Sequence, residues 1–150
     1  MLRTGCLALS IILSAEVSAA VPNVKVLIAK SLSNIEVEGI DLYKTIHTLK
    51  KTQTYAGRKR LAFNCKPAKN AASLPKNPLL VASLGSPTGL ISWGKHKYKG
   101  ELQLLTNPNK ESCDLVNLVP MEAYLTTLLS KEMNGTWPVE ALKAQAVAAR

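Results

Sequence analysis

The chain up to about residue 116 alternates between apolar and polar positions with the period of β-strands. Residues 24–29 (VKVLIA) are rich in β-branched side chains, and residues 34–40 (NIEVEGI) alternate apolar with charged positions. Both patterns are typical of strands. Further strands are predicted at LLVASL, GLISW and GELQLLT, with GSPTG as a turn between the first two. We also predict a hairpin turn around Gly57 and a loop over residues 66–78.

The pattern changes to a helical period near residue 118. An apolar stripe recurs at three- and four-residue spacing on one helix face, namely Met121, Leu125 and Leu128, with Glu132 in the next place. Pro120 stands at the start of this helix, where its missing N–H is harmless. The stripe therefore predicts that Glu132 lies on the apolar face of the helix.

A second helix is predicted after the Asn-Gly pair at residues 134–135, which tolerates positive φ and ends the first helix. Alanines at positions 141, 144 and 148 give this second helix a smooth side that allows another backbone to approach closely. We therefore predict an α+β fold, with a strand-rich N-terminal region over residues 21–116 and a C-terminal helical hairpin over residues 117–150.

A carboxylate on an apolar helix face is costly to ionise, because it loses its hydration there. A protonated acid beside a cleft is what glycosidic bond cleavage requires, since the leaving oxygen must be protonated. Trp137, five residues further on, offers a ring that can stack on a sugar, although a packing role is the commoner one. Glu132 has two plain alternatives: an ion pair with Lys143, or exposure to solvent at the helix end.

The first 20 residues have the layout of a secretory signal peptide. Arg3 precedes an apolar run from Cys6 to Leu13, and small residues follow. The run is too short to cross a bilayer comfortably. A buried first helix is the alternative interpretation. We expect cleavage near Ala19 or Ala20 and an exported protein, periplasmic or associated with the cell wall.

The chain is basic, with a formal net charge of +9 at pH 7, and one dense group of lysines lies at residues 95–99. Such a balance attracts polyanions: nucleic acid, anionic lipid or an acidic cell-wall polymer. Export makes nucleic acid an improbable partner, and the sequence has no nucleic-acid-binding motif. His47 and His96 are far apart and no CxxC motif is present. We therefore expect no metal site and no cofactor within this chain.

Two cysteines remain once a signal peptide is removed, Cys65 and Cys113. In an oxidising compartment they can pair, and the alternative is two half-buried free thiols. We predict that they pair in the exported protein.

Three stretches of the chain together carry a family resemblance: YKGELQLL, VNLVPMEAYLTTLLSKEM and WPVEALKAQAVAAR. They resemble the domain shared by stage II sporulation protein D and the amidase enhancer LytB, most strongly over residues 117–150. The resemblance implies that the target is bacterial peptidoglycan. It also implies that the glutamate of the Glu-Met pair, here Glu132, is the catalytic acid of a lytic transglycosylase. Trp137, Gln145 and Arg150 become candidate substrate-binding residues in the same matching run.

The chain departs from the family in two places. Pro often follows the Glu-Met pair in the family, whereas Asn134 follows it here. The family domain also continues well beyond the Ala-Ala-Arg run that ends at Arg150, and it supplies Cys and His residues for a metal there. We therefore expect an incomplete domain, truncated at its C-terminus.

Two functions follow from the resemblance as expectations. The first is an exported lytic transglycosylase that cleaves glycan strands with a single glutamate as acid and base, provided that the domain is complete. The second is a non-catalytic amidase enhancer that binds peptidoglycan and stimulates an N-acetylmuramoyl-L-alanine amidase. A non-functional remnant is a third interpretation.

Overall fold

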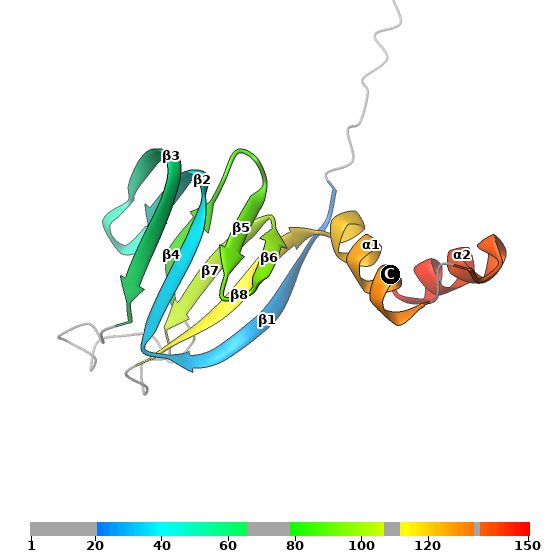
Figure 1. Ribbon diagram of the computed structural model, residues 1–150. Helices are drawn as coiled ribbons and strands as arrows, with labels where there is room; N and C mark the ends of the chain where they lie inside the picture. Colours follow the sequence, from blue (N-terminus) through cyan, green and yellow to red (C-terminus); the bar gives the residue numbers. More distant parts are fainter. Residues whose placement is uncertain (1–20, 66–78, 107–111, 134–135) are drawn as a thin grey trace, which may run out of the picture.

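The computed structural model describes residues 21–65, 79–106, 112–133 and 136–150. A strand-rich region comes first and the two α-helices come last, which confirms the predicted α+β class (Figure 1). The strands are β1 (Asn23–Leu32), β2 (Asn34–Ile46), β3 (Lys51–Asn64), β4 (Leu79–Gly85), β5 (Leu90–Trp93), β6 (His96–Lys99), β7 (Glu101–Thr106) and β8 (Cys113–Pro120). The helices are η1 (His47–Leu49), α1 (Met121–Glu132) and α2 (Val139–Ala148). The predicted signal peptide and the predicted loop at residues 66–78 lie outside the described residues.

The described strands form one antiparallel sheet in the order β1-β8-β7-β4-β2-β5-β6, with β3 paired to β2. Strands that follow one another in sequence pair as hairpins at β2–β3, β5–β6 and β7–β8. β1 and β6 stand at the two ends of this order, yet β6 contacts β8 because the sheet curves. In Figure 1, β5 and β6 accordingly lie in front of β7 and β8.

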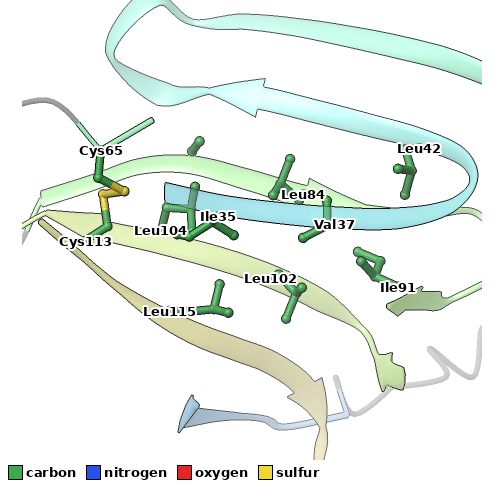
Figure 2. Packing of buried hydrophobic residues seen from close by; sticks show 11 residues of the cluster. Ile35, Val37, Leu42, Cys65, Leu84, Ile91, Leu102, Leu104, Cys113 and Leu115 are labelled. Carbon is green, nitrogen blue, oxygen red and sulfur yellow. A yellow bond between two sulfur atoms is a disulfide. The ribbon is translucent and has the colours of Figure 1, made fainter. Parts of the chain in front are cut away.

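The core lies on the inner face of this curved sheet. Its residues alternate along the strands with the predicted period of two, as Ile35 and Val37 do on β2 and Leu102 and Leu104 do on β7. All four are at most 1% exposed, and Figure 2 shows them pointing into one cluster. The alternation seen in the sequence therefore reports this inner face.

The predicted disulfide is present at one end of the core. Cys65 and Cys113 are bonded, both are buried, and their Cα atoms lie 5.6 Å apart (Figure 2). This separation falls within the usual range for a disulfide. The bond ties the segment just after β3 to the start of β8, and the backbone N–H of Cys65 also donates to the carbonyl of Ser33 at 3.0 Å.

The predicted hairpin turn around Gly57 is wrong, because β3 continues through this residue without reversing direction. The turn between β2 and β3 is at residues 47–50, where Lys50 takes φ +49°. Gly57 instead lies where the β2–β3 register shifts, opposite Asp41. Its N–H donates to Asp41 Oδ1 at 2.6 Å, and both residues have positive φ. A glycine with positive φ can serve either a β-bulge or a tight turn, so the glycine alone did not distinguish the two structures.

Gly100 joins β6 to β7. Because it has no side chain, this connection can lie close to the backbone of β8. Its φ is +84°, and a Cβ atom at this position would collide with the backbone carbonyl of Leu118 on β8. Any side chain here would therefore push the β6–β7 connection away from β8. Gly57 also has a positive φ, +71°, but no atom lies within 4 Å of the place its Cβ would occupy.

We expect Gly100→Ala to lower the free energy of unfolding by about 2–3 kcal/mol, since it adds a collision to the left-handed backbone strain. Gly57→Ala is the matched control and should lose only about 1 kcal/mol, because it suffers the strain alone. Urea unfolding of both variants measures the difference. Equal losses of stability in the two variants would show that the collision with the β8 backbone contributes nothing to the cost.

The two helices follow β8 directly. The N–H of Met121 donates to the carbonyl of Pro22 at 2.9 Å, and α1 contacts β1 and β8, with Leu125 buried. α2 contacts α1 but buries none of its own residues. The expected close approach along the alanine side of α2 is therefore wrong, because Ala144 and Ala148 are exposed. Within the described part of the chain, no helix is long and apolar enough to cross a membrane.

Candidate functional site

Glu132 is the last residue of α1, at the joint between the two helices. The sequence places Glu132 on the apolar face of the helix, yet its side chain is exposed. The apolar stripe leads from buried Leu125 to half-buried Leu128, and no residue of α2 is buried over its end. The helical period placed Glu132 correctly on the stripe, but the stripe extends beyond the elements that cover it.

The carboxylate of Glu132 has no hydrogen-bond or ion-pair partner among the described residues. The alternative ion pair with Lys143 is not formed, because the Lys143 ammonium lies 2.9 Å from Glu140 Oε1 on its own helix. The Glu132 side chain is therefore available to an external ligand at the surface, which corresponds to the alternative of solvent exposure.

Trp137 lies just before α2 and is 52% exposed. An indole that packs as a plug would be covered on both faces, so this exposure favours a surface role over a packing role. A half-exposed aromatic ring suits stacking on a sugar. The structure does not, however, record a contact between Trp137 and Glu132.

We expect Trp137→Ala to change the free energy of unfolding by less than about 1 kcal/mol, because the ring contributes little to the core. It should nevertheless weaken cosedimentation of the chain with purified sacculi. Trp93→Ala is the matched control: Trp93 packs against the core and beside Tyr98. Its loss should cost about 2 kcal/mol or more. A large stability loss in Trp137→Ala would make that residue a packing residue.

Arg150 is held away from Glu132. Its guanidinium forms an ion pair with Glu122, which lies in the first turn of α1. This contact brings the end of α2 back to the start of α1 and closes the helical hairpin. Glu122 and Glu132 are separated by ten residues, or about 15 Å along the helix. The structure therefore does not bring Arg150 and Glu132 together.

Gln145 lies in the middle of α2 with a half-buried side chain. Its recorded contact is a structural one, in which its backbone carbonyl accepts the N–H of Ala149 at 2.9 Å. The predicted substrate-binding residues thus lie at three separate places on the helical hairpin, and only Trp137 shares the joint region with Glu132.

The sequence did not predict a groove of about 420 Å³ between α1 and the sheet. Lys131, the neighbour of Glu132, lines this groove, as do Asn117 on β8 and His96 to Lys99 on β6. The lysine cluster at residues 95–99 was a visible signal in the sequence. Its position opposite α1 depends on the curvature of the sheet, which the sequence pattern does not reveal.

In the part of the chain that the structure describes, no three His, Cys, Asp or Glu residues gather closely enough to hold a metal ion. No step proposed below runs through a metal ion.

Comparison with known proteins supports the resemblance in the C-terminal segment. Residues 109–150 match the family model described as stage II sporulation protein. An uncharacterized protein of Brachyspira hyodysenteriae is 44% identical over 54 residues, which is 36% of this chain and 14% of the relative. The aligned part is therefore a small share of that relative's length. No solved structure matches the chain. The family resemblance read from the residues is confirmed for the segment that contains Glu132.

Proposed function

We propose, from the stage II sporulation protein match at residues 109–150, that this is an exported protein directed at peptidoglycan that cleaves glycan strands as a lytic transglycosylase. The observation that carries the proposal is the position of Glu132. It lies inside the matched segment, at an exposed helix joint, with no partner among the described residues for its carboxylate.

Export is supported by two features of the chain. The disulfide between Cys65 and Cys113 is the kind of bond that persists in oxidising compartments. The net charge of +9 favours association with a polymer that carries carboxylates. Peptidoglycan lies outside the cytoplasm and carries carboxylates, so it meets both conditions.

The proposed reaction needs one carboxyl group in two protonation states. The Glu132 carboxyl donates its proton to the glycosidic oxygen as the bond to the anomeric carbon breaks. The resulting carboxylate then accepts the proton of the same sugar's 6-hydroxyl, whose oxygen bonds to the anomeric carbon and closes an anhydro ring. Glu132 thus regains the proton that it donated, and no water is consumed.

A second candidate, the non-catalytic amidase enhancer, is favoured by the exposure of Glu132. General acid catalysis gains from a site that excludes water, and the described residues build no wall around this carboxylate. An exposed surface with Trp137 is sufficient for binding a polymer and presenting it to an amidase.

The two candidates are separated by the products released from purified sacculi. A lytic transglycosylase produces glycan strands that end in anhydro-muramic acid, which mass spectrometry detects. An enhancer produces none by itself, but it increases the release of peptides when an N-acetylmuramoyl-L-alanine amidase is added. Anhydro ends produced by the chain alone would establish the first function. Their absence, with amidase stimulation, would establish the second.

A further inference from the structure

Glu132 does not line the groove between α1 and the curved sheet, although its neighbour Lys131 does. The groove has a volume of about 420 Å³. Its floor and walls come from β1, β6, β8 and α1, together with Leu90 at the start of β5. These elements are far apart in the sequence and meet because β6 contacts β8 and α1 contacts both β1 and β8.

Asn117 is an unsatisfied polar group in the lining of this groove. It lies on β8, is 8% exposed, and pairs in the sheet with Val26 and Leu102. Its Oδ1 atom is buried and has no hydrogen-bond partner in the part of the chain that the structure describes. A buried acceptor without a partner is unusual and costly. A ligand that carries a peptide amide can supply the missing donor, because its N–H can donate to the Asn117 oxygen.

The charge around the groove has one sign. Lys97, Lys99 and Lys131 line it, with His96 beside them, and no aspartate or glutamate is among the lining residues. These three lysines make no ion pair within the described residues. The rim therefore has free cations that favour a carboxylate-bearing ligand.

The remaining lining is apolar or aromatic. Val26, Ile28 and Val119 cover one side, and Tyr98 and Tyr124 add rings with polar ends. The Tyr98 hydroxyl can donate a hydrogen bond, and burial raises its pKa above the usual value. An apolar floor, an amide and a cationic rim together match the three parts of a short acidic peptide: side-chain methyl groups, peptide units and carboxylates.

A second hollow of similar volume provides a contrast. It lies over β2, β3 and β5, where its lining includes Glu36, Glu38 and Arg60. Those charges are already paired, with Arg60 3.1 Å from Glu36 and 3.5 Å from Glu38. The groove beside α1 differs because its lysines and its buried amide lack partners within the described residues.

We propose that the groove lined by Asn117, Lys97 and Lys131 is a binding site for a short carboxylate-bearing peptide. A peptide unit of the ligand pairs with the Asn117 amide, and its carboxylates lie against the lysines of the rim. This site goes beyond glycan cleavage, and it does not require Glu132 to be catalytic.

The test is an NMR titration of the ¹⁵N-labelled chain with acetyl-Ala-Glu-Ala bearing a free C-terminal carboxylate, in about 20 mM salt, so that screening is weak. We expect backbone shifts at Asn117, Tyr98 and Thr127. Lys97→Gln combined with Lys131→Gln should raise the Kd at least about fivefold. Asn117→Leu, which replaces the orphaned amide by an apolar group of similar size, should also abolish the shifts while the chain stays folded.

The matched control removes the same charge elsewhere. Lys51→Gln combined with Lys59→Gln changes two exposed lysines on β3 and should alter the Kd less than about twofold. Equal binding of the uncharged peptide acetyl-Ala-Gln-Ala-amide would overturn the proposal. Chitotetraose shifting the groove resonances, with the acidic peptide shifting none, would overturn it in favour of a sugar site. Because the readout is binding, a chain that fails to cleave glycan leaves this test unaffected.

Discussion

Glu132→Gln is expected to reduce the release of anhydro-muramic ends from sacculi by at least about 100-fold, since general acid–base catalysis contributes that much or more. Glutamine keeps the size and polarity of the side chain but can neither donate nor accept the required proton. Glu132 is exposed and makes no recorded interaction with another described residue. The variant should therefore keep its stability within about 0.5 kcal/mol, as surface substitutions do.

Glu140→Gln is the matched control for this experiment. Glu140 is an exposed glutamate in the first turn of α2, and its partner is the nearby Lys143. It removes the same negative charge from the same helical hairpin without touching Glu132. Cleavage should therefore be unchanged in Glu140→Gln. An equal loss in both variants would indicate that overall charge, and not one proton donor, controls the reaction.

Retention of anhydro ends in Glu132→Gln would remove Glu132 from the chemistry. If the unmodified chain releases none and instead stimulates an added amidase, the enhancer function is the correct one. In that case Glu132→Gln should leave the stimulation unchanged, whereas Trp137→Ala should weaken it if Trp137 binds the polymer. The pair of variants thus distinguishes acid catalysis from polymer binding.

The strands were predictable because local alternation reports the inner face of a sheet directly. Ile35 and Val37 face the core as their spacing predicts, and so do Leu102 and Leu104. The turn at residues 47–50 was not predictable, because it has no glycine or proline and ends on Lys50 in the left-handed region. The hairpin was wrongly predicted at Gly57 because a glycine with positive φ can form a bulge as well as a turn.

The candidate site was predictable only in part. Periodicity shows which helix face a side chain lies on, but it does not show whether other elements bury that face. Glu132 lies on the stripe that its spacing indicates, yet the described elements leave it exposed. The groove beside α1 has the opposite problem. Val26, Tyr98, Asn117 and Lys131 meet there from four separate elements, and no local pattern links them. Only long-range strand order and curvature place them together.

Reducing the disulfide is expected to lower the free energy of unfolding by about 4 kcal/mol, if its effect comes from closing a loop in the unfolded chain. Cys65 and Cys113 are separated by 48 positions, so the bond restrains a long stretch of the unfolded chain. The melting temperature should fall by about 10 °C or more. Calorimetry with and without reductant measures this change.

The combined substitution Cys65→Ala and Cys113→Ala provides the control for the reductant itself. It should reproduce the loss of stability, and reductant should then have no further effect. Both cysteines are buried in the core beside Ile35 and Leu115, so the variant also loses some packing. Its loss should therefore equal or exceed that of reduction. If denaturation without reductant instead exposes two free thiols, the bond is absent from the exported protein, and the proposed export loses one of its two supports.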